Sequence, residues 1–184
     1  SLRLDACGRS GDEEGRHFLE SMISEIDAVL DLVGRYEAEA RRLGRDDIAD
    51  TFARVPRLGA TTFREALQSF RVLHFVLWCE GEYHNTVGRL DQYMLPYLEA
   101  DLASGRLDRD EAFDLLEEFF LSFNRDSDLY PGVQQGDNGQ TLTLGGVRPD
   151  GSPAVNELTR MVLRVACDLE LIDPTGAVAA SSTG

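Results

Sequence analysis

Thr141–Leu144, with the sequence Thr-Leu-Thr-Leu, is the one convincing strand pattern in this 184-residue chain, and Gly145 and Gly146 end it. Every other strongly patterned segment has helical spacing, so the sequence offers this strand no partner. A single strand does not form a stable sheet. We therefore predict that the partners of this strand lie outside the chain, and that the chain is a piece of a longer protein.

The remaining patterned segments have the apolar spacing of helices. Thr62 and Glu65 form a capping pattern before the most apolar of them, which we expect to be buried on all sides. Ser152 followed by Pro153 is typical of the start of the last helix. Pro96, inside another helical segment, requires a kink or a new helix start. The fold class is therefore mainly α, with predicted helices at residues 17–43, 46–55, 62–81, 90–102, 108–123 and 153–172, the last one ending before Asp173 and Pro174.

The two ends of the chain lack a packing pattern. Residues 1–15 are polar and rich in glycine, and residues 177–184 read Ala-Val-Ala-Ala-Ser-Ser-Thr-Gly. We expect residues 1–15 to be a disordered leader and residues 175–184 a disordered tail. Residues 16–174 then form the structured part, which we take to be a partial domain.

Charge and composition exclude several functions. The chain has 18 Lys and Arg against 33 Asp and Glu, a net charge of −15. Such a surface repels phosphate backbones and anionic lipid, so we expect no nucleic-acid partner and no membrane partner. No apolar run approaches the roughly 18 residues that a membrane-spanning helix needs. The three widely spaced cysteines do not resemble a disulfide scaffold, and they favour a reducing, cytoplasmic location.

Trp78–Asn85 gathers a thiol, carboxylates, a phenol, an imidazole and an amide where the most apolar helix ends. Such a loop is a common place for a ligand, and a solvated turn after a buried cysteine is the alternative. A zinc site with Cys79 and His84 needs two more ligands, so we predict no metal. Cys167 is expected to be a buried small hydrophobic residue. Residues 134–140 are glycine-rich, which suits either close approach to a ligand or a plain tight turn.

Three blocks of sequence follow one another in a recognisable order. They are Phe63-x-Glu65-Ala66-Leu67-Gln68; Gly88-Arg89-Leu90-Asp91-Gln92-Tyr93 with Pro96; and Gly139-Gln140 with Leu142-Thr143-Leu144-Gly145-Gly146, completed by Asp150-Gly151 and Asn156-Glu157-Leu158-Thr159. Together they resemble the pyruvate formate-lyase-like domain of glycyl radical enzymes, over roughly residues 16–174.

The resemblance implies a fold and a chemistry. The fold is a ten-stranded α/β barrel surrounded by helices, of which this chain is the N-terminal helical portion with one barrel strand near residues 141–146. The chemistry is that of a formate acetyltransferase-like acyltransferase, lyase or dehydratase, in which a radical on a backbone glycine passes to a cysteine thiol that abstracts hydrogen from a small substrate. The resemblance also implies a homodimer, anaerobic conditions and a separate activating enzyme that uses S-adenosylmethionine.

The radical-carrying residues of the family have no match in this sequence. The Arg-Val-x-Gly-Tyr-like motif of the radical glycine is absent, and neither Cys79 nor Cys167 matches the thiyl cysteine. We therefore expect no catalytic residue, no bound cofactor and no activity in this chain alone. In several family members a His-Ser pair before the second block touches substrate. Without a gap Tyr83 and His84 take these places, and with a one-residue gap His84 and Asn85 do, so the resemblance implies His84 and Asn85 as substrate-binding residues.

A second function stays open from the residues themselves. The chain is then a non-catalytic, acidic helical module that binds a partner protein. Its apolar helix at residues 70–79 and its unpaired strand form the recognition surface in that case.

Overall fold

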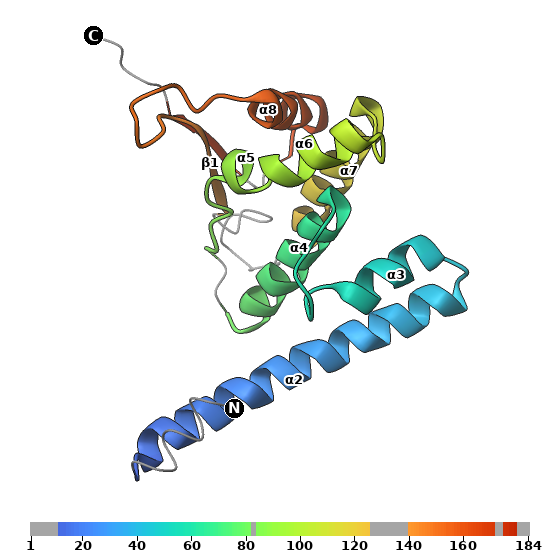
Figure 1. Ribbon diagram of the computed structural model, residues 1–184, viewed down its shortest axis with the longest axis vertical. Helices are drawn as coiled ribbons and strands as arrows, with labels where there is room; N and C mark the ends of the chain where they lie inside the picture. Colours follow the sequence, from blue (N-terminus) through green and yellow to red (C-terminus); the bar gives the residue numbers. More distant parts are fainter. Residues whose placement is uncertain (1–10, 82–83, 126–139, 172–174, 180–184) are drawn as a thin grey trace, which may run out of the picture. The chain divides into compact units, whose positions relative to one another are not determined.

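The computed structural model describes residues 11–81, 84–125, 140–171 and 175–179 (Figure 1). It divides into two compact units, residues 1–58 and residues 59–184, which are treated separately below. Helices dominate both, so the prediction of a mainly α chain is confirmed. None of the helices in the described ranges combines the length and the apolar character needed to span a membrane.

Unit 1 is a pair of helices, α2 (Glu13–Arg42) and α3 (Asp46–Arg54). Gly44, with a φ of 70°, makes the turn between them. Tyr36 of α2 stacks on Phe52 of α3, with ring centroids 5.6 Å apart. The expected leader is wrong for residues 13–15, which are helical because the Asp12 side chain caps α2 by accepting from the Gly15 amide at 2.9 Å. Residues 1–10 lie outside the described part.

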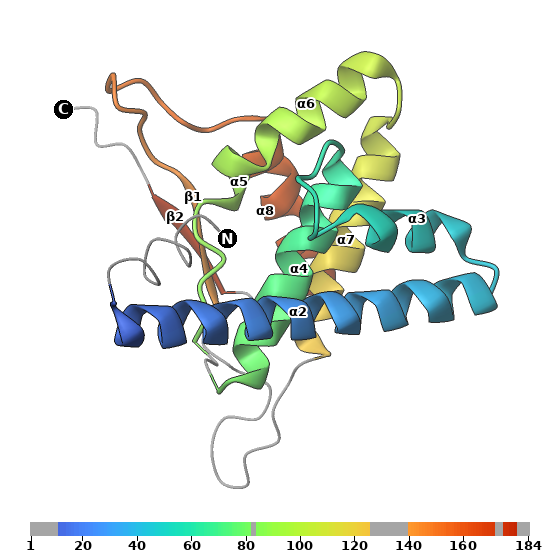
Figure 2. The ribbon, with the colours of Figure 1, turned by 60° about the horizontal axis from the view of Figure 1, so that its bottom comes forward.

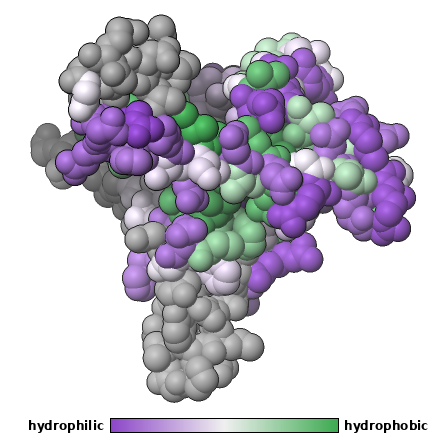
Figure 3. Space-filling model, turned by 90° about the horizontal axis from the view of Figure 1, so that it is seen from below, coloured by the Kyte–Doolittle hydropathy of each residue, from purple (hydrophilic) through white to green (hydrophobic). Residues whose placement is uncertain are grey.

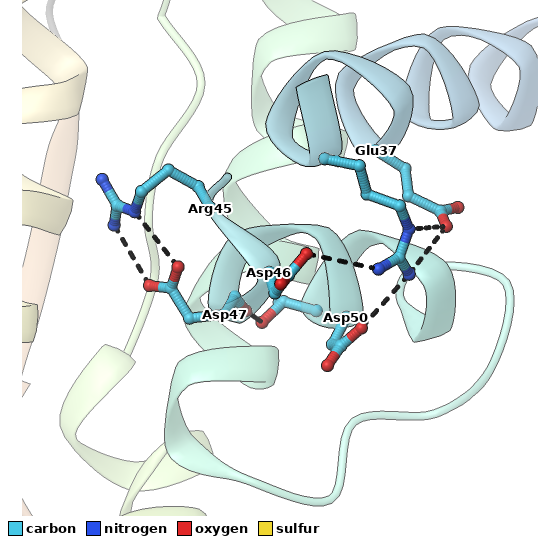
Figure 4. Close-up of polar contacts among 7 residues, drawn as sticks. Glu37, Arg45, Asp46, Asp47 and Asp50 are labelled. Carbon is cyan, nitrogen blue, oxygen red and sulfur yellow. Dashed lines mark hydrogen bonds and ion pairs between the residues drawn. The ribbon is translucent and has the colours of Figure 1, made fainter. Parts of the chain in front are cut away.

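Ion pairs cross the turn between α2 and α3 (Figure 4). The Arg41 guanidinium lies 3.1 Å from carboxylate oxygens of both Glu37 and Asp50, and Arg45 lies 3.1 Å from Asp47. These side chains are largely exposed, so water and salt screen the attraction. These ion pairs set the geometry of the turn but contribute little to the free energy of unfolding.

Unit 2 contains five helices among its described residues: α4 (Phe63–Cys79), α5 (Leu90–Tyr93), α6 (Leu95–Ser104), α7 (Arg109–Asn124) and α8 (Glu157–Leu169). Thr62 caps α4 as expected, by accepting from the Glu65 amide. The expectation that α4 is buried all round is wrong, since Leu73 and Leu77 are about half exposed. Pro96 lies in the first turn of α6, so a new helix starts there and no hydrogen bond is lost.

The last helix begins later than its sequence pattern suggests. Asn156, not Ser152, caps α8, and its side chain accepts from the Thr159 amide at 3.0 Å. The Ser152 amide and hydroxyl instead donate to Asp150, which forms a turn before the helix. The Ser-Pro pattern therefore marks a local turn, because the nearby carboxylate competes for the serine.

The sheet has two strands, β1 (Thr141–Gly145) and β2 (Thr175–Ala179), which pair in parallel with Thr141 opposite Thr175 (Figure 2). The prediction that β1 has no partner in this chain is therefore wrong. The expectation of a tail without structure is also wrong for residues 175–179. The small residues of β2 carry no alternating pattern, and its backbone hydrogen bonds to β1 make it a strand.

The core of unit 2 lies where α4, α6, α7 and α8 meet the inner face of β1. Leu142 and Leu144 reach it from the strand, and three phenylalanines reach it from α7. Its largest fully buried side chains are Phe63, Phe120, Phe123, Leu90, Leu98, Leu116, Leu142, Leu144 and Leu158.

Candidate functional site

The segment that leads into α5 runs beside the start of β1. The Val87 amide donates to the Thr141 carbonyl oxygen at 2.7 Å. Gly88 forms a parallel bridge with Leu142. This segment holds one edge of β1 while β2 holds the other, so residues 84–86 enter next to the start of the strand.

Asp91, at the start of α5, joins β1 to α8 and is fully buried. Its Oδ2 accepts from the Gly145 amide at 2.7 Å and from the Thr159 hydroxyl at 2.6 Å. Its backbone oxygen accepts from the Asn156 side-chain amide at 2.8 Å. A single residue thus connects the end of the strand with the first turn of the last helix.

Three neighbours of Asp91 also donate to backbone carbonyl oxygens, two of them in distant segments. Arg89 donates to the Gly145 carbonyl oxygen at 2.6 Å, and Gln92 donates to that of Ala154 at 2.9 Å. Tyr93 donates to the Val87 carbonyl oxygen at 2.6 Å. Burial raises the pKa of the Tyr93 hydroxyl, which keeps it a donor. We call Arg89, Asp91, Gln92 and Tyr93 the α5 clamp, and its role in this structure is to hold backbone in place.

Of the two predicted substrate-binding residues, His84 is exposed and Asn85 is half-buried. His74, in α4, lies against the same turn, with its Nε2 3.3 Å from the Asn85 carbonyl oxygen. The His74 ring is 4% exposed and meets the Phe123 ring edge-on at 4.9 Å. The structure therefore seats Asn85 at the end of α4, beside the start of β1. Tyr83, the other candidate for this position, lies outside the described residues.

Gln140 is the last residue of the glycine-rich segment, residues 134–140, and the sequence did not predict its burial. It is fully buried at the start of β1, although its sequence surroundings read as a polar loop. Neither its Nε2 nor its Oε1 has a hydrogen-bond partner. Its position two residues before Leu142, on the same side of an extended chain, is the signal that could have shown its burial. Residues 126–139 of the preceding loop lie outside the described residues.

Two of the three cysteines lie within the described residues. Cys79 and Cys167 are both exposed and not in a disulfide. The expectation of a buried Cys167 is wrong, because α8 turns Val162 and Val165 toward the core and leaves Cys167 on its solvent side. Within the described ranges, no three His, Cys, Asp or Glu side chains lie together so that they could hold a metal ion.

The family model described as pyruvate formate lyase-like matches residues 3–183. Among curated relatives, the trans-4-hydroxy-L-proline dehydratase of Clostridioides difficile is 30% identical, over 95% of this chain and 24% of the relative. The isethionate sulfite-lyase of Nitratidesulfovibrio vulgaris is also 30% identical, over 88% of this chain and 22% of the relative. The chain thus spans about a quarter of the length of the curated relatives it matches.

Solved structures of glycyl radical enzymes also have a backbone similar to that of this chain. The Clostridioides difficile hydroxyproline dehydratase, solved with trans-4-hydroxy-L-proline bound, superposes with a TM-score of 0.88 at 29% identity, over 98% of this chain and 26% of that one. A glycyl radical enzyme from Archaeoglobus fulgidus superposes with a TM-score of 0.86 at 28% identity, over 96% of this chain and 25% of that one.

Proposed function

The chain belongs to the pyruvate formate lyase-like family, and on that premise we propose that it forms the N-terminal part of a glycyl radical enzyme. The reaction proposed is dehydration or bond cleavage of a small organic substrate. The names of the relatives favour this over acyl transfer of the formate acetyltransferase kind, since they are dehydratases, a decarboxylase and sulfite-lyases.

The observation that carries the proposal is the parallel pairing of β1 with β2. Parallel sheets occur with both faces covered and with more than two strands. In this chain helices cover the face of β1 that carries Leu142 and Leu144, whereas Thr141 on the opposite face is exposed. Such a sheet is suited to be the first part of a barrel that further strands complete.

The proposal assigns no radical chemistry to the residues of this chain. The radical glycine and the thiyl cysteine would come from the rest of the enzyme, and an S-adenosylmethionine-dependent activating enzyme would install the radical. A homodimeric, cytoplasmic enzyme is part of the same proposal. The contribution of this chain is to build one wall of the barrel and to place substrate-binding residues on it.

We assign substrate binding to His84 and Asn85. The α5 clamp supports this role, because it fixes Val87 and Gly88 against β1 and so limits the movement of the turn just before them. A rigid support of this kind gives a polar side chain the defined position that recognition requires. An imidazole and an amide at such a place are able to hydrogen-bond a substrate hydroxyl or carboxylate.

A chimaera tests the proposal. The matching quarter of the hydroxyproline dehydratase is replaced by this chain, and the product is activated anaerobically with that enzyme's own activase. We expect a glycyl radical signal in electron paramagnetic resonance. A soluble, folded chimaera that never acquires the radical contradicts the proposal.

The site assignment is tested in the same chimaera. His84→Ala and Asn85→Ala should each lower turnover at least tenfold while leaving the radical yield and the thermal midpoint near those of the parent. Exposed Glu99→Ala is the control and should change none of the three quantities. Unchanged turnover in both site variants would refute the assignment and leave the family membership intact.

A non-catalytic interaction module is the other candidate. Exposed apolar side chains support it: Phe18, Met22 and Ile26 lie four residues apart along α2 and are 64%, 46% and 54% exposed. Figure 3 shows such hydrophobic surface, in green, among hydrophilic residues. The strand that this function would use, β1, is not unpaired, however, because β2 pairs with it. The enzyme is therefore the function that the geometry supports better.

A further inference from the structure

Helices α4 and α7 of unit 2 form a groove of about 420 Å³ between them. The two helices lie side by side (Figure 2), and the ring centroids of Phe70 and Phe119 are 5.9 Å apart. One turn further along both helices, His74 meets Phe123 at 4.9 Å. The contacts advance together, so the helices run in the same direction. The groove therefore has one end near the start of α4 and the other near the end of α7.

Arg71, from α4, lines this groove and is held in one orientation. Its Nε donates to the Ser122 hydroxyl at 2.7 Å, and its Nη2 donates to the Ser122 carbonyl oxygen at 3.0 Å. Its guanidinium carbon lies 5.2 Å from the centre of the Phe123 ring and 5.7 Å from that of Phe75. An aromatic ring attracts a cation at such distances. The positive charge of Arg71 therefore has a defined place on the wall of the groove.

Two more arginines, Arg64 and Arg125, line the same groove. No carboxylate within the described ranges forms an ion pair with either of them. Among the described residues of the lining, Glu118 is the only acidic one, so three positive charges stand against one negative charge. The chain as a whole has a net charge of −15. A local excess of positive charge in such an acidic chain indicates a site for an anion.

The arginines lie toward opposite ends of the groove. Arg64 and Arg71 are seven residues apart on α4, which corresponds to about 10 Å along the helix axis. Arg125 comes about one turn after Ser122, the partner of Arg71, and so belongs to the Arg71 end. The floor between the ends is apolar and at most 8% exposed, and it consists of Leu67, Leu115 and Phe119. A fitting ligand has an anionic group at each end and apolar atoms between them.

We infer that the α4–α7 groove binds a small organic dicarboxylate. Guanidinium groups bind carboxylates through paired hydrogen bonds, and two carboxylates balance the excess positive charge of the lining. The volume is that of a site for a small molecule, and the acidic surface of the chain repels larger polyanions. The inference goes beyond the proposed function, because neither the α5 clamp nor His84 and Asn85 line this groove.

The first test is isothermal titration calorimetry of the full chain with adipate, at constant ionic strength because salt screens such attraction. Adipate has a carboxylate at each end of an aliphatic chain. Hexanoate has one carboxylate, and 1,6-hexanediol has the same length as adipate without charge. We expect adipate to bind, hexanoate to bind about tenfold more weakly, and hexanediol to give no heat of binding. The absence of adipate binding, or equal binding of either control compound, overturns the inference.

The second test uses substitutions at the two ends of the groove. Arg64→Gln and Arg125→Gln remove side chains that make no hydrogen bond or ion pair within the described part of the chain. Each should keep the wild-type midpoint of thermal unfolding and weaken adipate binding about tenfold. Arg57→Gln is the matched control: it makes the same change of charge at an exposed arginine outside the groove and should leave the affinity unchanged.

The control separates a specific site from general attraction to positive charge. If neither groove variant weakens adipate binding, or if Arg57→Gln weakens it as much as they do, the inference is overturned. Neither test involves radical formation, so the inference and the proposed function fail separately.

Discussion

Replacing Asp91 with alanine should be among the most destabilising single changes in unit 2. Its Oδ2 is the acceptor for two donors, the Gly145 amide and the Thr159 hydroxyl, and Thr159 is 1% exposed. Asp91→Ala leaves both without a partner, and a buried unpaired donor costs about 1–3 kcal/mol. We therefore expect a loss of about 2–5 kcal/mol in the free energy of unfolding, measured by urea denaturation followed by circular dichroism. That is a large share of the roughly 5–15 kcal/mol of a typical domain.

Two further variants separate the hydrogen bonds from simple loss of volume. Asp91→Asn keeps one acceptor oxygen and should lose less than half as much stability as Asp91→Ala. Thr159→Val removes one of the donors, so combining it with Asp91→Ala should cost less than the sum of the two single changes. A loss below about 1 kcal/mol for Asp91→Ala, or strict additivity in the double variant, would refute the reasoning.

One further prediction concerns Tyr93 of the α5 clamp, and another concerns the expectation that this chain has no radical-carrying residue. Tyr93→Phe should cost about 1 kcal/mol of stability at neutral pH, because the variant has no hydroxyl to donate to the Val87 carbonyl oxygen. Burial raises the pKa of Tyr93 above its ordinary value, so the free energy of unfolding of the wild type should fall as pH rises through about 10. Urea titrations of Tyr93→Phe should show a smaller loss over the same range. The isolated chain, incubated anaerobically with an activating enzyme and S-adenosylmethionine, should give no glycyl radical signal in electron paramagnetic resonance, and the appearance of that signal would show that a radical-carrying residue has been overlooked.

The α5 clamp gives a physical meaning to the second sequence block. Asp91 and Gln92 attract attention as polar residues beside a candidate site, but their side chains bond to Gly145 and Ala154 instead of facing solvent. The block is therefore better understood as the part that sets the position of β1. A substitution in this block should lower stability directly, and it should lower activity only as a consequence of that loss.

Local sequence determined the helices and most of their ends. Apolar periodicity and caps such as Thr62 before α4 depend on residues three or four apart, so short-range pattern is enough to predict them. The same holds for β1, whose alternation places Leu142 and Leu144 on one face. The family could also be recognised from the order of the three blocks.

Tertiary structure alone decided the rest. β2 has no strand pattern and exists because β1 offers it backbone partners, and the start of α8 moved to Asn156 because its side chain also bonds to Asp91. The burial of Gln140 depends on Val87 and Gly88, more than fifty residues earlier in the chain, lying against the start of β1. Hydrogen bonds between distant segments create these features, and a pattern of neighbouring residues carries no information about which distant backbone will be adjacent.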